Sequence, residues 1–324
     1  MERLAAFIAT ASGGRNVRVD RYERLSGGAI QENFALDVNI DGRDEALVLR
    51  RDAPSCVAVS CTRAEEFALL RAAFAAGVVV PEPLWASDDP DVVGAPFFIM
   101  RRVAGTAVGR RIVRDEALGG DRSTLAARLA EQLARIHAIR PPRADLAFLG
   151  PARSVHDFVT EAYAFLDATG RVEPALELGL RWLDVNAPAP AETVLLHGDF
   201  RTGNYMLDAN GITAILDWEF AGWGDPHEDI GWFFARSWRF GAVEREAGGV
   251  GSRVAFYSAY QQAGGRNIDD GRVRYWEAFA HARWAIIARR QADRHHGGAE
   301  RSLELLLIGT LAPDADELLL RAIA

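Results

Sequence analysis

The hydrophobic period of the chain changes near residue 100, and this change constrains the fold more than any other feature. Over residues 34–40, apolar residues alternate with polar or small ones, which is typical of a half-buried strand. Over residues 125–136, apolar residues recur every three or four positions, which is typical of a buried helix. We therefore expect a bilobal α+β protein. Its small β-rich N-terminal lobe spans residues 1–103, and its larger, mostly helical C-terminal lobe spans residues 104–324.

The N-terminal lobe is expected to be built around a β-hairpin. Asp41-Gly42 is a tight-turn signal between the strand at 34–40 and a second strand at 46–50. A glycine-containing turn at 25–29 connects this hairpin to an earlier strand. The remaining strands of the lobe are expected near residues 21–25, 84–87 and 96–100.

One main helix is expected in the same lobe, over residues 62–76. Thr62 and Glu65, three residues apart, form a capping-box pattern at its start. Its apolar stripe consists of Phe67, Leu70 and Phe74. A short helix is also expected at the N-terminus, because Glu2 offsets Arg3 and the apolar run is too short for a signal peptide.

The C-terminal lobe is expected to contain one small apolar hairpin among its helices. A strand at 194–196 leads into His197, and the two hairpin strands follow at 204–207 and 212–216. Most of the chain after residue 225 has a helical pattern, which ends in a pair of C-terminal helices.

Composition and charge limit the classes of partner. The 324-residue chain carries 37 Lys and Arg against 45 Asp and Glu, a formal net charge of −8. This acidic balance argues against a nucleic-acid or anionic-membrane partner, and it favours a cationic small substrate over an anionic one. The two cysteines, Cys56 and Cys61, exclude a disulfide framework, make a poor zinc site and fit a reducing, cytoplasmic environment. No stretch approaches the roughly 18 apolar residues of a membrane-spanning helix.

Polar residues stand at the ends of the apolar hairpin and of the strand before it. Asn204 lies five residues after Asp199, and Asp217 ends the second hairpin strand, where the hairpin brings it back beside Asn204. Phosphoryl transfer from ATP needs a carboxylate that orients and deprotonates the attacking hydroxyl, and oxygen ligands for Mg²⁺. Protein kinases place aspartate and asparagine at this spacing, before a later aspartate in D-F-G. Alternatively, H-G-D forms a simple turn and Asp217 caps a helix, but the combined spacing favours catalysis.

The stretch from residue 195 to residue 229 resembles the aminoglycoside phosphotransferase/choline kinase family. The resemblance rests on H-G-D-F-R-T-G-N at 197–204, I-L-D-W-E at 215–219 and W-G-D-P-H-E-D at 223–229. More narrowly, these motifs look like those of the branch associated with acyl-CoA dehydrogenases. The resemblance implies a protein-kinase-like fold and the ATP- and Mg²⁺-dependent phosphorylation of a hydroxyl group on a small molecule.

The same resemblance implies roles for residues of the C-terminal lobe. Asp199 would be the catalytic base, and Asn204 and Asp217 would be the Mg²⁺ ligands. His197 would support the catalytic loop. Asp229 would anchor that loop by accepting backbone N–H bonds, or it would be an ordinary carboxylate near a helix start.

In the N-terminal lobe, the resemblance implies that a glycine loop and a cation hold the phosphates. Ser26, Gly27 and Gly28 would cover the phosphates, because glycines let backbone N–H groups approach them. Arg50 stands where the family carries a lysine that contacts the α- and β-phosphates, and Arg51 is the competing candidate. An arginine can fill this electrostatic role with a different geometry.

Two further contacts to the nucleotide are expected around this cation. Glu66, on the predicted helix, is the expected carboxylate partner of Arg50, because Glu65 is already used in the capping box; alternatively, Glu66 is a solvated surface residue. Met100 and Arg102 lie at the end of the last strand and in the connection to the C-terminal lobe, whose backbone would hydrogen-bond adenine.

These motifs favour an ATP-dependent phosphotransferase that acts on a small-molecule hydroxyl acceptor. The alternative is a nucleotide-binding, kinase-like module without turnover, which only the missing lysine supports. A protein kinase is disfavoured by H-G-D in place of H-R-D and by D-W-E in place of D-F-G. The acceptor stays open among aminoglycosides, amine alcohols, sugars and hydroxyacyl-CoA compounds, because fold and catalytic motif do not specify the substrate.

Overall fold

The computed structural model describes most of the chain. The predicted phosphate-covering residues Ser26, Gly27 and Gly28 lie outside the described residues, as does Cys56. The described residues are 1–25, 31–52, 61–189, 192–264, 266–298 and 301–324.

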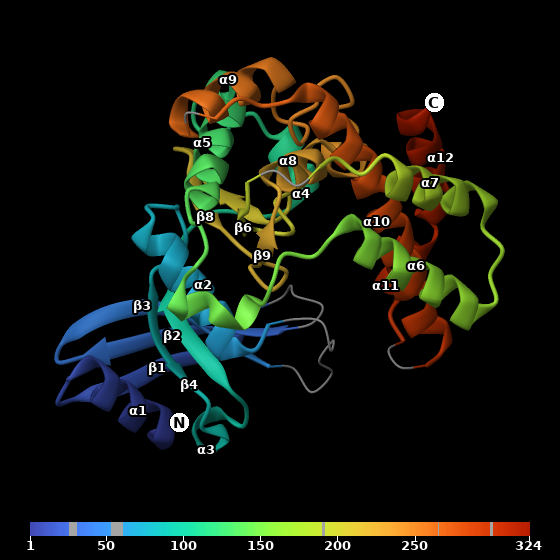
Figure 1. The fold of residues 1–324 in the computed structure, drawn as a ribbon. Coiled ribbons are helices and arrows are strands. Elements are labelled where there is room, and N and C mark those ends of the chain that lie inside the picture. Colours follow the sequence, from blue (N-terminus) through green and yellow to red (C-terminus); the bar gives the residue numbers. More distant parts are fainter. Residues whose placement is uncertain (26–30, 53–60, 190–191, 265, 299–300) are drawn as a thin grey trace.

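The N-terminal part contains an antiparallel five-stranded sheet in the order β1-β2-β3-β5-β4 (Figure 1). The predicted hairpin is confirmed, because β2 and β3 pair outward from Ile40 and Arg43. Asp41 and Gly42 between them have φ of 50° and 85°. Positive φ at both central residues matches a type I′ turn, which explains the Asp-Gly pair. The strands are β1 Val17–Arg24, β2 Gln31–Ile40, β3 Arg43–Asp52, β4 Pro83–Ser87 and β5 Phe97–Arg101.

Helix α1 (Glu2–Ser12) covers one face of this sheet, with the short helix α3 (Pro90–Val93) beside it. Leu4 and Ile8 of α1 share a buried cluster with Phe34, Leu36 and Val38 of β2. Because side chains alternate along a strand, the other face of the sheet is lined by the residues between these. Helix α2 packs on β3, β4 and β5, whereas the edge strand β1 stays largely exposed.

Helix α2 (Arg63–Ala75) begins at Thr62 with the predicted capping box, in which Thr62 and Glu65 exchange side-chain and backbone hydrogen bonds. Its predicted apolar stripe is partly wrong, because Phe74 is 47% exposed. The buried side of the helix is rotated toward Glu66, which is 2% exposed. Glu66 points inward to Arg50 of β3, and this ion pair sets the face that the helix presents.

The C-terminal part is mostly helical, as expected (Figure 1). Two small antiparallel sheets lie among the helices: β6 (Val194–Leu196) pairs with β9 (Gly222–Gly224), and β7 (Tyr205–Leu207) pairs with β8 (Ile212–Ile215). The sequence predicts the β7–β8 hairpin but not the pairing with β9. No described helix is long and apolar enough to cross a membrane. The α-helices are α4 Gly109–Arg114, α5 Leu125–His137, α6 Val155–Thr169, α7 Pro174–Val185, α8 Pro226–Phe234, α9 Arg253–Gly264, α10 Asp270–His296, α11 Leu303–Gly309 and α12 Ala312–Ile323.

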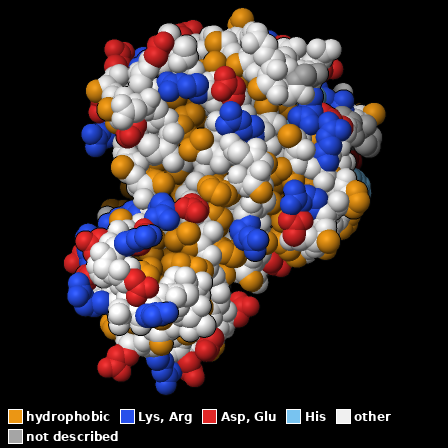
Figure 2. Space-filling view, turned by 90° about the vertical axis from the view of Figure 1, so that its left-hand side faces the viewer, with side chains coloured by type: hydrophobic (Ala, Val, Ile, Leu, Met, Phe, Trp, Pro, Cys, Tyr) orange, Lys and Arg blue, Asp and Glu red, His pale blue; other side chains and the backbone are white. Residues whose placement is uncertain are grey.

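The β7–β8 hairpin lies where the two parts of the chain meet. The N–H of Thr106 donates to the carbonyl of Leu207 at 2.9 Å, just after the connection between the lobes. On the other hairpin strand, the N–H of Ile215 donates to the carbonyl of Val79 at 2.7 Å. Figure 2 shows the smaller lobe below the larger one, with an indentation where they meet. The hairpin thus carries its end residues to the junction of the lobes.

Candidate active site

The loop that follows β6 begins with a turn that only glycine fits. Gly198 has φ of 76°, a left-handed conformation that is unfavourable for other residues. A Cβ at this position would also overlap the backbone carbonyl of Phe220. The glycine of the H-G-D motif therefore lets the loop turn tightly against the segment that follows β8.

Asp229 of helix α8 holds this turn in place. Its carboxylate accepts the backbone N–H groups of His197 at 2.7 Å and of Gly198 at 2.9 Å. It also faces the Nε2 atom of His137 at 3.2 Å, and the Nδ1 atom of His137 lies 2.7 Å from the hydroxyl of Tyr260. Asp229 thus makes the backbone contacts that the sequence predicts for a loop anchor.

His197 makes two contacts within the loop rather than facing solvent. Its Nε2–H donates to the carbonyl of Leu216 at 2.9 Å, and its Nδ1 accepts the N–H of Asp199 at 3.2 Å. Burial lowers the pKa of His197, outweighing the attraction of Asp229 and Asp199. The imidazole is therefore neutral, and it joins the catalytic loop to the end of the hairpin.

Asp199 is almost buried, and three side chains donate to its carboxylate. Trp232 Nε1–H donates to Oδ1 at 2.7 Å, and Asn204 Nδ2 donates to Oδ2 at 2.5 Å. Arg201 Nε contacts the two oxygens at 3.1 and 3.2 Å. A carboxylate has about four lone-pair sites, and the Nε–H of Arg201 is shared between the two oxygens, so an acceptor hydroxyl would take the place of one of these two shared contacts.

The contacts of Arg201 and Trp232 are absent from the sequence-based site. Arg201 lies within the H-G-D-F-R-T-G-N motif itself. Trp232 lies three residues after Asp229, which places both residues on the same face of α8. That helical spacing is the one signal that could have pointed to Trp232.

Asn204 and Asp217 lie side by side at the hairpin ends. Leu216 N–H donates to the backbone carbonyl of Asn204 at 2.8 Å, which brings the next residue, Asp217, beside Asn204. Asn204 uses its amide N–H on Asp199, which leaves its amide oxygen as an acceptor. Asp217 has φ of 60°, and its side chain is 40% exposed.

These donor atoms fit Mg²⁺. An amide oxygen and a carboxylate are the hard oxygen ligands that this ion prefers. Mg²⁺ also keeps several waters and usually binds through one or two carboxylates together with substrate phosphates. A site of this kind needs no larger cluster, and the described residues hold no group of three or more His, Cys, Asp and Glu arranged for a metal.

Arg50 connects the two lobes at this point. Its Nε contacts Glu66 at 3.1 Å, and its NH1 contacts Asp217 at 3.2 Å. Glu66 is contacted by Arg63 as well. Arg51, the competing candidate, pairs instead with Glu32 at 2.8 Å. The structure thus brings together Arg50, Glu66 and Asp217.

The hinge residues have other partners. Met100 is half-buried and packs against the main core. The N–H of Arg102 donates to the carbonyl of Ala46 at 2.9 Å, and its guanidinium contacts Asp37 at 2.5 Å. Because the sheet already uses the N–H of Arg102, a contact of Arg102 with adenine would have to come from its backbone carbonyl.

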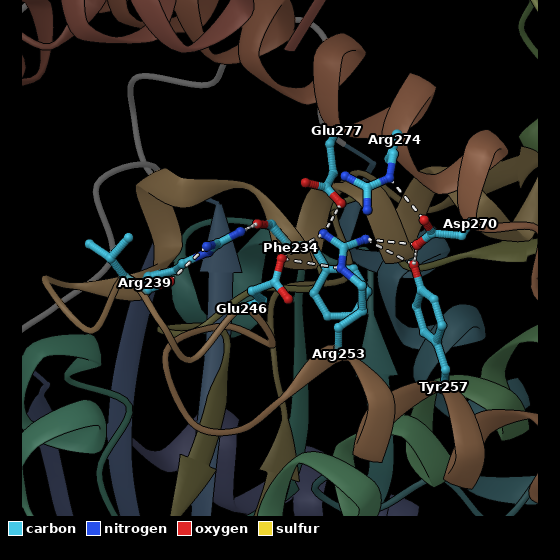
Figure 3. Close-up of polar contacts among 9 residues, drawn as sticks. Phe234, Arg239, Glu246, Arg253, Tyr257, Asp270, Arg274 and Glu277 are labelled. Atoms are coloured by element: carbon cyan, nitrogen blue, oxygen red, sulfur yellow. Dashed lines mark hydrogen bonds and ion pairs between the residues drawn. The ribbon is translucent and has the colours of Figure 1, made fainter. Parts of the chain in front are cut away.

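A second polar network, centred on Arg253, fixes a segment that contacts the catalytic loop; Figure 3 shows Arg253 with Glu246 and Glu277. The hydroxyl of Thr202 donates to the carbonyl of Gly248 at 2.6 Å. The segment that carries Gly248 is fixed by Arg253, which contacts Glu246 at 3.2 Å and also pairs with Glu277 of α10. The loop is therefore tied to helices α9 and α10 as well as to α8.

The fold and this site define a kinase-like phosphotransferase architecture. The model of the phosphotransferase enzyme family, APH, matches residues 21–284. The chain belongs to this family, and the predicted resemblance is confirmed.

Curated relatives of the chain are much longer proteins. Acyl-CoA dehydrogenase family member 11 from Pongo abelii is 27% identical over 285 residues, covering 82% of this chain and 36% of the relative. Acyl-CoA dehydrogenase family member 10 from Mus musculus is 30% identical over 199 residues, covering 58% of this chain and 18% of the relative. The chain therefore spans about a third or less of these relatives.

Solved structures share the complete fold. A candidate aminoglycoside phosphotransferase from Ralstonia eutropha is 20% identical, with a TM-score of 0.77 over 99% of this chain and 97% of that one. Aminoglycoside phosphotransferase APH(4)-Ia, solved with AMP-PNP and hygromycin B, is 18% identical, with a TM-score of 0.63 over 99% of both chains. The predicted kinase-like α+β fold is confirmed.

Proposed function

We propose that this chain is an ATP- and Mg²⁺-dependent phosphotransferase that phosphorylates a hydroxyl group of a small molecule. The observation that carries the proposal is the meeting of Asp199, Asn204, Asp217 and Arg50 where the lobes join. Crystal structures of APH(4)-Ia hold AMP-PNP or ADP together with hygromycin B, which supports nucleotide use and a small-molecule acceptor.

In this proposal Asp199 is the catalytic base. Its carboxylate accepts the hydroxyl of the acceptor in place of one of the two contacts shared by Arg201, while Trp232 and Asn204 hold the carboxylate in a fixed orientation. The acceptor oxygen forms a bond to the γ-phosphorus, the bond from that phosphorus to the β,γ-bridging oxygen breaks, and ADP leaves. The hydroxyl proton passes to Asp199. A positioned base of this kind typically contributes roughly 10²–10⁴-fold.

Asn204, Asp217 and Arg50 hold the donor end of the reaction. The oxygens of Asn204 and Asp217 would bind Mg²⁺, which supplies positive charge against the phosphates when bound. Arg50, oriented by Glu66, presents a planar guanidinium that binds phosphate oxygens through two hydrogen bonds.

The proposal is tested by screening for a phosphorylated product. The purified chain is incubated with ATP, Mg²⁺ and pooled metabolites, and mass spectrometry records any ATP-dependent gain of one phosphate. The expected result is a product whose formation matches ADP release and stops when EDTA removes Mg²⁺. ATP hydrolysis without a phosphorylated acceptor across broad metabolite pools would contradict the proposal.

One observation favours the alternative of a nucleotide-binding module without turnover. Arg50 contacts Asp217 at 3.2 Å, so a guanidinium occupies a carboxylate oxygen that a metal would need. The same incubation separates the two functions. Saturable Mg²⁺-independent ATP binding with no ADP release, measured by calorimetry, would favour the module over the enzyme.

A further inference from the structure

Three tryptophans, Trp232, Trp238 and Trp284, pack in a row next to Asp199, and their indole rings are called the indole wall below. Trp232, whose Nε1–H donates to Asp199, packs against Trp238 with ring centroids 5.1 Å apart. Trp238 in turn packs against Trp284 of α10 at 4.8 Å. Together with Ala280 these residues form a separate apolar cluster next to the catalytic loop. An acceptor whose hydroxyl reaches Asp199 must lie close to this wall.

Two guanidinium groups cover the faces of the first two indoles. The Arg283 guanidinium lies 4.6 Å from the ring centroid of Trp232, and that of Arg201 lies 4.7 Å from the ring centroid of Trp238. Arginine stacks well on indole, and the stacked group keeps its N–H donors free at its edge. The rings are therefore already occupied by cations, which leaves no open aromatic face for a cationic acceptor.

Arg283 differs from Arg201 in having no anionic partner. Arg201 is held by Asp199, whereas Arg283 donates no hydrogen bond and forms no ion pair within the part of the chain that the structure describes. Arg283 is also only half-buried, so its N–H groups remain accessible. An unpaired, half-buried guanidinium on a rigid indole is a ready binding group for a carboxylate or phosphate.

Glu228 only partly offsets the charge of Arg283. Glu228 of α8 lies in its neighbourhood, but burial raises the pKa of Glu228 to about 7, with Asp229 and Asp225 adding to the rise against the opposing effect of Arg283. Near neutral pH this carboxyl is about half protonated. Arg283 thus keeps part of its positive charge uncompensated, although the whole chain carries −8.

We propose that the acceptor carries an anionic group, a carboxylate or phosphate, which Arg283 binds while the acceptor hydroxyl reaches Asp199. The inference rests on the proposed phosphotransferase function and names its substrate class: hydroxy compounds with an acidic group about one indole width from the hydroxyl. The net charge of the chain favours a cationic substrate, but the positive charge of Arg283 next to Asp199 would repel one. Asp199 and Arg283 contact the same Trp232 ring, at its N–H edge and at its face, which fixes their spacing.

The test compares matched acceptors on wild-type and variant proteins. The panel consists of short hydroxy acids and hydroxyalkyl phosphates, their neutral hydroxy amides and their amino alcohols, at several hydroxyl-to-charge spacings. Wild-type kcat/KM should be at least about tenfold higher for an anionic acceptor than for its neutral match. Arg283→Gln should lower kcat/KM for that acceptor by about 10- to 100-fold, mainly through KM, and leave the neutral acceptors unchanged. Arg283→Lys should restore part of the loss.

Arg290→Gln is the matched control. Arg290 lies on the same helix, is exposed, and stacks on Phe165 with its guanidinium 5.1 Å from the ring centroid. This variant should phosphorylate every acceptor as the wild type does. Equal loss on anionic and neutral acceptors in Arg283→Gln, or a preference for amino alcohols in the wild type, would overturn the inference and leave the proposed function standing.

Binding is measured separately from turnover by the quenching of tryptophan fluorescence, since the guanidinium of Arg283 stacks on the indole of Trp232. The hydroxy acids should quench the wild type but not Arg283→Gln. Acids that bind through Arg283 and are never phosphorylated would overturn the proposed function, while the anion site would stand. A wild type that binds none of the anionic acceptors would overturn the inference.

Discussion

Replacing Asp229 with asparagine is expected to lower the free energy of unfolding by about 4 kcal/mol and to slow turnover. The Asp229 carboxylate accepts the N–H groups of His197 and Gly198 at 2.7 and 2.9 Å and faces Nε2 of His137 at 3.2 Å. Burial alone would raise the pKa of Asp229, but the hydrogen bonds from His137 and from the backbone of His197 outweigh burial and lower that pKa. The site therefore favours the charged form over a neutral amide.

The expected loss of about 4 kcal/mol in the free energy of unfolding follows from the three groups that donate hydrogen bonds to Asp229. Asparagine offers one acceptor oxygen in place of two, so the N–H of Gly198 would face the amide NH₂ group. Losing one hydrogen bond to a charged group costs about 1.5–3 kcal/mol. The other two hydrogen bonds then go to a neutral acceptor and keep about half of their strength, so each loses roughly 1 kcal/mol. Because Gly198 directly precedes Asp199, the shifted loop should also lower kcat by ~10²-fold.

Equilibrium urea unfolding measures the stability change, and ADP release with an identified acceptor measures the change in turnover. Asp167→Asn is the control, because Asp167 is exposed on α6 and should change the free energy of unfolding by less than about 0.5 kcal/mol. An Asp229→Asn protein that unfolds within about 1 kcal/mol of the wild type would refute the claim that this carboxylate holds the loop.

Two further substitutions test the cation and the buried acid. Arg50→Ala should raise the KM for ATP by about 100-fold and Arg50→Lys by about tenfold, since one ammonium cannot pair with Glu66 and also make two hydrogen bonds to phosphate oxygens. Arg51→Lys should leave this KM unchanged, and an effect there equal to that at Arg50 would reverse the assignment. Burial raises the pKa of Glu228 from 4.5 to about 7, so the folded protein favours the protonated carboxyl. The free energy of unfolding therefore falls as the pH rises from about 4.5 to 7. Glu228→Gln mimics the protonated acid, so urea unfolding should show the wild type losing about 1–2 kcal/mol relative to the variant between pH 5 and pH 8, after allowance for partial exposure; parallel curves would contradict this.

Local signals predicted the elements that position the site. The Asp41-Gly42 pair predicted its hairpin because the turn needs positive φ at both residues. Thr62 and Glu65 predicted the start of α2 because capping depends on neighbouring residues alone. The spacing of the residues around Asp199 likewise depends on one short loop and one hairpin.

Contacts set by packing could not be predicted in the same way. Trp232 reaches Asp199 only because α8 lies across the catalytic loop, 33 residues further along the chain. Phe74 is exposed because Glu66 turns α2 toward Arg50, and an apolar pattern gives no weight to a buried ion pair. Net charge is a sum over the whole surface, so it could not predict that Arg201 and Arg283 stack on indole rings next to Asp199.

The central claim is that Asp199 is the base of a phosphotransferase, and one comparison tests it most directly. Phosphorylated product is measured by mass spectrometry for wild-type and Asp199→Ala proteins at saturating ATP, Mg²⁺ and acceptor, while calorimetry measures the Kd for Mg²⁺-ATP. The account predicts that kcat falls by about 10²–10⁴-fold while this Kd changes by less than about threefold. A loss of less than about tenfold in kcat, with nucleotide binding intact, would contradict the account.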